Sequence, residues 1–66
     1  IKKMRKVLKE ARIAAGMTQQ KVANLVGISH TYYAKIEAGE RTGDFYIWDT
    51  LEDIFGIHQR KLREID

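Results

Sequence analysis

The sequence predicts an all-α fold, a compact five-helix bundle that forms a single domain over residues 1–66. Apolar residues recur at three- and four-residue steps along most of the chain, which is typical of amphipathic helices. No segment alternates apolar and polar residues as a half-buried strand does. Glycine stands where four of the periodic segments stop, and proline is absent, so glycine alone separates the expected helices.

The first helix is expected from about Lys2 to Ala15, with Gly16 ending it. Its apolar residues share one face, and they are Met4, Val7, Leu8, Ala11 and Ala15. Residues 1–12 also carry six basic side chains against one acidic side chain, which attracts a polyanion. Such a run is, by itself, often only a solvated helix face.

Residues 19–38 describe two short helices joined by a tight turn. Thr18 is an expected cap for a second helix that begins at Gln19. Ala23 is small enough for the point where two helices cross, and Gly27 can take the positive φ that ends the helix. Ser29 then caps a third helix from His30 to about Ala38. This spacing predicts a helix-turn-helix.

A loop over residues 40–43 is followed by a fourth helix, which Asp44 caps and Gly56 stops. Its expected core stripe consists of Phe45, Trp48, Leu51, Ile54 and Phe55, while Asp49, Glu52 and Asp53 face water. A short fifth helix is expected from about Gln59 to Ile65, with His58 as a solvent-facing cap. Ile57, Leu62 and Ile65 are expected to offer an apolar edge.

Several classes of function are disfavoured by composition. Without cysteine, the chain offers no disulfide and no cysteine-based metal site. His30 and His58 fall on different expected helices, and no carboxylates converge on them, so we expect no catalytic residue, metal, cofactor or small-molecule substrate. No apolar run approaches a membrane span of roughly 20 residues. We therefore expect a cytoplasmic, non-enzymatic protein; because it begins at Ile1, we also expect a missing start or a trimmed parent.

The segment Thr18–Gly39, TQQKVANLVGISHTYYAKIEAG, resembles the phage repressor and Cro family of helix-turn-helix proteins, also called the Xre type. The resemblance rests on the Thr-Gln start, the Ala and Gly of the turn, the Ile-Ser entry and the Ile-Glu-x-Gly exit. It implies a lambda-repressor-like DNA-binding domain that sets its third helix in the major groove of double-stranded DNA. It also implies a transcriptional regulator, most simply a repressor, that works as a homodimer.

The resemblance further implies roles for individual residues. His30, Thr31 and Lys35 match the positions at which the family reads bases. Gln19 matches a position that contacts the DNA backbone, and Tyr32, which lies beside the base-reading residues, is assigned to the backbone as well. Arg12 and Glu37 match a structural pair that ties the first helix to the third. Glu40 stands where the family often has a basic residue, and Gly43 replaces a frequent proline.

The helical repeat of the third helix points to the same three side chains, independently of the resemblance. If Tyr33 and Ile36 turn inward, then His30, Thr31 and Lys35 turn outward, and all three can hydrogen bond to base edges. Neutral His30 can either donate or accept. The Tyr32 ring can cover the helix edge, or its hydroxyl can reach a phosphate.

A second hypothesis is a protein-interaction or antitoxin-like module that uses the same scaffold and binds DNA weakly. The acidic fourth helix and the apolar edge at Ile57, Leu62 and Ile65 favour it. The same edge would equally suit a homodimer contact.

Overall fold

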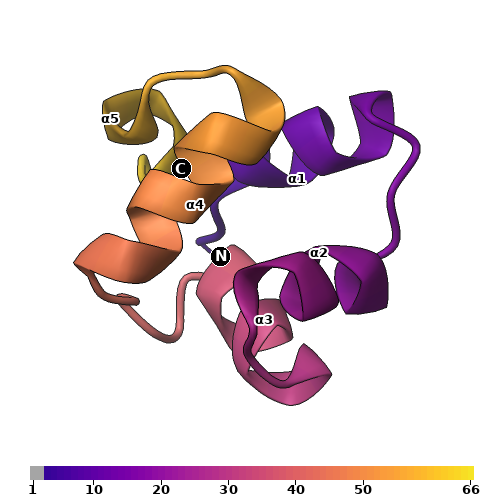
Figure 1. Cartoon of the computed structure of the whole chain (residues 1–66). Helices are drawn as coiled ribbons and strands as arrows, with labels where there is room; N and C mark the ends of the chain where they lie inside the picture. Colours follow the sequence, from indigo (N-terminus) through magenta and orange to yellow (C-terminus); the bar gives the residue numbers. More distant parts are fainter. Residues whose placement is uncertain (1–2) are drawn as a thin grey trace.

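The computed structural model describes residues 3–66, in which five helices form the regular structure. They are α1 (Lys6–Ala14), α2 (Gln19–Val26), α3 (His30–Glu37), α4 (Phe45–Phe55) and α5 (Gln59–Leu62). Figure 1 shows α2 and α3 on one side of the molecule and α4 and α5 on the other, while α1 contacts both α3 and α5. No strand occurs among the described residues, and the predicted all-α fold is confirmed.

Side-chain caps begin three helices at the residues that the sequence predicts. The caps are Thr18, Ser29 and Asp44, whose side-chain oxygens accept from the amide three residues later at 3.0, 3.1 and 3.0 Å. Each cap satisfies an amide that has no partner within its own helix. His58, which is exposed, begins α5 by accepting from the Arg60 amide through Nδ1 at 3.0 Å.

The turn between α2 and α3 depends on Ala23 and Gly27. Ala23 is fully buried where the two helices pack together. Its carbonyl accepts from the amides of Gly27 and Ile28 at 2.9 and 3.0 Å, while Gly27 adopts a φ of 85°. A side chain at Gly27 would be strained at that φ, so this glycine sets the direction in which α3 leaves the turn.

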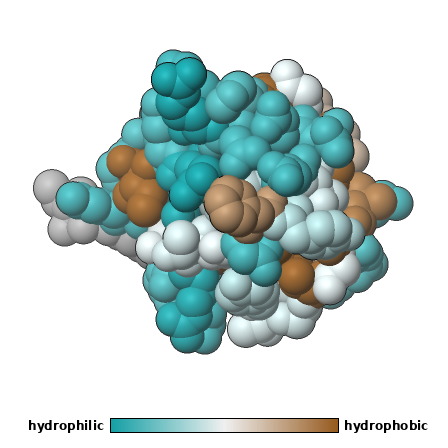
Figure 2. Space-filling view, turned by 60° about the vertical axis from the view of Figure 1, so that its left-hand side comes forward, coloured by the Kyte–Doolittle hydropathy of each residue, from teal (hydrophilic) through white to brown (hydrophobic). Residues whose placement is uncertain are grey.

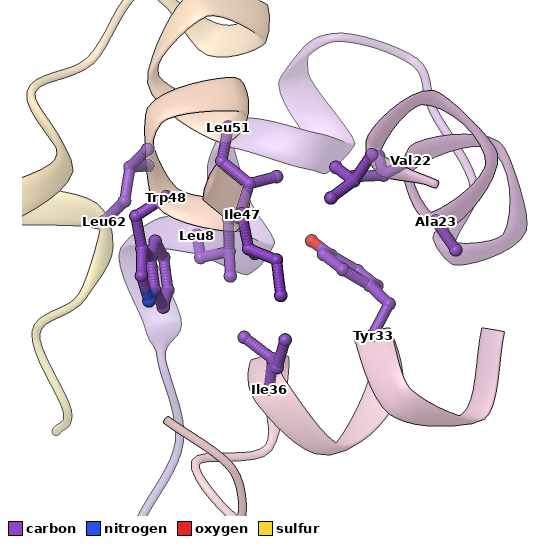
Figure 3. Close-up of a cluster of buried hydrophobic side chains, with 10 residues drawn as sticks. Leu8, Val22, Ala23, Tyr33, Ile36, Ile47, Trp48, Leu51 and Leu62 are labelled. Carbon is purple, nitrogen blue, oxygen red and sulfur yellow. The ribbon is translucent and has the colours of Figure 1, made fainter. Parts of the chain in front are cut away.

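The core lies between α3 and the helices that surround it. Its buried hydrophobic members are Leu8, Val22, Ala23, Val26, Tyr33, Ile36, Ile47, Trp48, Leu51 and Leu62. Figure 3 shows Tyr33 and Ile36 of α3 pointing toward Ile47 of α4. Burying a large apolar side chain contributes about 1.5–3 kcal/mol. Tyr33 and Trp48 belong to the core, as the sequence predicts.

The predicted start of α1 is wrong, although Lys2 itself lies outside the described residues. Residues 3–5 are not helical, and α1 begins at Lys6 after Arg5, whose ψ of 82° lies outside the helical range. The Arg5 carbonyl accepts from the Lys9 amide at 3.1 Å, while its amide donates to the Glu37 carbonyl at 2.9 Å and so ties the start of α1 to α3. The helix ends at Ala14, one residue before the predicted end.

Arg5 is the buried cation that the sequence did not reveal. Its side chain is only 5% exposed, and Nη1 donates to the carbonyls of Ile36 and Arg41 at 2.6 and 2.9 Å. Nε donates to the Arg63 carbonyl at 3.2 Å. The guanidinium also lies 5.1 Å from the centre of the Trp48 ring, where cation–π attraction adds to the hydrogen bonds. Arg5 therefore joins the end of α3, the following loop and the C-terminal segment.

Trp48 is held from several sides. The guanidinium of Arg63 lies 5.8 Å from the ring centre, and the indole Nε1 donates to the Thr42 carbonyl at 2.7 Å. Gly43 adopts a φ of 76°, and a Cβ added there would lie 2.9 Å from the indole Nε1. The missing side chain at Gly43 is what gives the indole room to reach Thr42.

The prediction that Phe45 belongs to the core stripe is wrong, because its side chain is 81% exposed and Ile47 is buried in its place. Residues of an α-helix are separated by about 100°. Relative to Leu51, Ile47 therefore lies about 40° away around the helix and Phe45 about 120° away. Figure 2, which views the side of α4 and α5, shows apolar side chains as separate spots on a mostly hydrophilic surface.

The predicted apolar edge at Ile57, Leu62 and Ile65 is also wrong, because Leu62 is fully buried. The last helix ends at Leu62 rather than at Ile65. Beyond it, the Asp66 amide donates to the Met4 carbonyl at 2.9 Å. This contact brings the C-terminal segment against the N-terminal segment and ends the helical path.

We predict that Arg5→Met lowers the free energy of unfolding by about 1–3 kcal/mol, because the carbonyls of Ile36, Arg41 and Arg63 each lose a hydrogen bond while the apolar stem is kept. Urea unfolding followed by circular dichroism measures this change. Lys6→Met is the matched control, since Lys6 is the next residue and its side chain is exposed. Equal stability of the two variants would show that the Arg5 hydrogen bonds do not hold the fold.

We also predict that Gly43→Ala destabilises the protein more than Gly16→Ala does. Both glycines adopt a positive φ, 76° and 70°, so both substitutions strain the backbone. Only a Cβ at residue 43 meets the indole, whereas nothing lies within 4 Å of one at residue 16. Loss of the Trp48–Thr42 hydrogen bond adds about 1 kcal/mol to the cost at residue 43. Equal melting temperatures would contradict this account.

Candidate functional site

The outward face of α3 forms a shallow groove of about 410 Å³. Its walls are His30, Thr31, Ala34, Lys35, Ala38 and Glu40. The structure thus brings together His30, Thr31 and Lys35, the three side chains that the helical repeat and the resemblance both predict as base-reading residues. Ala34 and Ala38 are small, so a ligand can approach the backbone of α3 closely between the polar groups.

Tyr32, Gln19 and Lys9 flank this groove in different ways. Tyr32 is half-buried and packs against the core cluster. Gln19 lies in a second groove of about 510 Å³ on the other flank of α3, which Lys9 and Arg12 of α1 also line. The site prediction omitted Lys9, although its place three residues before Arg12 puts both on one face of a helix.

A buried carboxylate, that of Glu37, lines the second groove. Arg12 donates to it through Nε at 2.9 Å and Nη2 at 3.0 Å, which ties α1 to α3. The Tyr33 hydroxyl donates to the same oxygen as Nε at 2.8 Å, and Gln19 Nε2 donates to the other oxygen at 3.2 Å. Each carboxylate oxygen therefore accepts from two donors. These hydrogen bonds replace the hydration that the carboxylate loses on burial.

The protonation of this network follows from its contacts. Burial alone would raise the pKa of Glu37, but the hydrogen bonds from Arg12, Tyr33 and Gln19 and the charge of Arg12 outweigh it, so this pKa is lowered. Burial and the neighbouring Glu37 charge raise the pKa of the Tyr33 hydroxyl. Hydrogen bonding to Glu37 raises the pKa of Arg12. The arrangement keeps an ionised pair at neutral pH, with the Tyr33 proton in place.

Gln19 connects this network to the first groove. Its Oε1 lies 3.3 Å from Nε2 of His30, while its Nε2 is bound to Glu37. The sequence assigned Gln19 to the DNA backbone and His30 to the bases, and did not predict contact between them. The turn joins the end of α2 to the start of α3, and the packing of α2 against α3 then brings the two long side chains together.

Neither a metal site nor a membrane helix emerges from the described part of the chain. Within residues 3–66, no three metal-ligating side chains gather. None of the helices described is long and apolar enough to cross a membrane.

Comparison with known proteins identifies relatives of this arrangement. The family model described as helix-turn-helix matches residues 8–62. Among solved structures, the chain is similar to the restriction-modification controller protein C.AhdI from Aeromonas hydrophila, with a TM-score of 0.72 and 31% sequence identity over 83% of each chain. No match to this chain was found among curated protein sequences.

We predict that stability depends on acid pH through Glu37. Because its folded pKa is lowered, the carboxylate stabilises the fold above its unfolded pKa, about 4.3. That contribution is lost as pH falls through the folded pKa. Glu37→Gln should therefore be less stable than the parent at pH 7, and the difference should shrink on acidification. Urea unfolding between pH 7 and pH 3 checks this, and a difference independent of pH would contradict it.

Proposed function

This chain belongs to the helix-turn-helix family of DNA-binding transcriptional regulators, and we propose that it is a repressor that inserts α3 into the major groove of double-stranded DNA. One observation carries the proposal. The outward groove of α3 gathers His30, Thr31 and Lys35 beside two alanines, which suits close approach to base edges. Lys35 would donate to guanine O6 and N7, and Thr31 would contact a thymine methyl group or a polar base atom.

Backbone contacts would come from the flanks of this groove. The first amides of α2 follow the Thr18 cap, and a helix N-terminus attracts phosphate. Gln19 at that start, Lys9 on α1 and the Tyr32 hydroxyl are the side chains that we assign to the DNA backbone. A repressor of this kind would occlude a promoter, and we expect it to act in the cytoplasm, where its operator is accessible.

We infer that the protein binds as a homodimer. Half-sites for such dimers lie about 34 Å apart, one turn of DNA. The longest dimension of the chain is 30 Å, so two copies side by side would present their α3 helices at a comparable spacing. Phe45 and Tyr46 are 81% and 66% exposed at the start of α4, and they are the apolar side chains that we assign to the contact between copies.

The protein-interaction alternative loses part of its basis in this structure. Its proposed apolar edge included Leu62, which is buried in the core. The similar solved structure is named as a controller protein, which favours gene control for this chain as well. Selection that recovered no DNA motif, with only weak binding abolished by salt, would restore the alternative to first place.

We predict that selection from randomised double-stranded DNA, scored at two salt concentrations, recovers a palindromic motif. His30→Ala or Lys35→Ala should each weaken binding to it by about 1–3 kcal/mol, because a base contact is lost. Lys9→Ala should weaken binding to all sequences and reduce the salt slope by about 1. Lys61→Ala, at an exposed position of α5, is the control. Unchanged binding by the His30 and Lys35 variants would refute the assignment of base contacts.

A further inference from the structure

A chain of hydrogen bonds links the buried ion pair to the reading face of α3. Arg12 holds Glu37, Glu37 accepts from Gln19 Nε2 at 3.2 Å, and Gln19 Oε1 lies 3.3 Å from His30 Nε2. Gln19 is half-buried, whereas His30 is exposed in the groove. The buried Glu37 carboxylate can therefore orient Gln19, and Gln19 can orient the exposed His30 ring that would meet a ligand.

The chemistry of these partners fixes where the protons are. An ionised carboxylate only accepts hydrogen bonds, so Gln19 must turn its NH₂ group toward Glu37. Its carbonyl oxygen then faces His30, and a carbonyl can only accept. Nε2 of His30 must therefore carry a proton. Since a neutral imidazole has one N–H, its Nδ1 is left as an acceptor.

We propose that Gln19 is a positioning residue that holds neutral His30 as the Nε2–H tautomer, so that Nδ1 selects a base bearing an exocyclic amino group. Cytosine N4 and adenine N6 present such donors in the major groove. Guanine O6 and N7 and thymine O4 are acceptors, and they would be rejected by a bare Nδ1. The inference rests on the proposed function and deepens it by naming the base class that His30 reads.

Gln19 is the described residue that hydrogen bonds to the His30 ring, so we assign control of the tautomer to it. Lys35 and Glu40 line the same groove as the charged side chains, and Thr31 and the two alanines are neutral. Among the described residues, no hydrogen bond from any of these to the imidazole is present, whereas Gln19 bonds to Nε2. Glu37 influences the ring only through the Gln19 amide.

The tautomer can be measured without DNA. Long-range proton–nitrogen correlation spectra of the ¹⁵N-labelled chain, at a pH where His30 is neutral, distinguish a protonated ring nitrogen from a bare one. We expect a protonated Nε2 and a bare Nδ1 for His30. Gln19→Leu should increase the Nδ1–H fraction of His30, whereas Gln20→Leu, an exposed neighbour that bonds to Asn24, should not. A His30 that is protonated on Nδ1 in the parent would overturn the proposal.

The base preference is then tested on the selected operator. Replacing the amino-bearing base opposite His30 by its analogue without that group, pyrimidin-2-one for cytosine or purine for adenine, should weaken binding roughly 5- to 150-fold. Gln19→Leu and His30→Ala should reduce this discrimination, while Gln20→Leu keeps it. A guanine or thymine selected at that position, or discrimination that survives both variants, would overturn the base reading. Failure of the parent to select any motif would overturn the proposed function and this base reading together, whereas the spectra would still report on the tautomer.

Discussion

The Glu37 carboxylate is the group on which the arrangement of the first three helices depends. It is buried, so its charge must be met by donors, and those donors come from α1, α2 and α3 itself. Arg12 binds both oxygens with a planar fork, which fixes angle as well as distance. A shift of α3 against α1 or α2 would leave part of this charge unpaired in a dry environment. Electrostatics therefore selects one orientation of α3 among those that hydrophobic packing would allow.

A second guanidinium, that of Arg5, holds the C-terminal end of α3. It donates to the Ile36 carbonyl near the helix end, which also accepts from the Gly39 amide at 3.1 Å. The same group contacts the Trp48 ring and the carbonyls of Arg41 and Arg63, so the loop after α3 and the C-terminal segment are fixed together. Arg12 and Arg5 thus restrain α3 at two points, its Glu37 side chain and its C-terminal backbone, while the face with His30, Thr31 and Lys35 stays open as the groove.

This restraint has a consequence for recognition. A helix that is already held in place loses little further freedom on binding, which favours discrimination between similar ligands. Through Gln19, the restraint extends from the core to one side chain of the groove, His30. Thr31 and Lys35 rely on the position of α3 alone. The three side chains that we assign to base contacts are therefore ordered to different degrees before any ligand arrives.

What the sequence by itself determined was local. Caps at Thr18, Ser29 and Asp44, the positive φ at Gly27 and the phase of α3 depend on neighbours within a few residues, so their signals can be read along the chain. The tertiary structure decided what depends on distant partners. The carbonyls that bind Arg5 lie 31, 36 and 58 residues away, and nothing near Arg5 in the sequence indicates them. The same holds for the site. The helical repeat predicted which side chains face outward, whereas the bond between Gln19 and His30 exists only because α2 packs against α3.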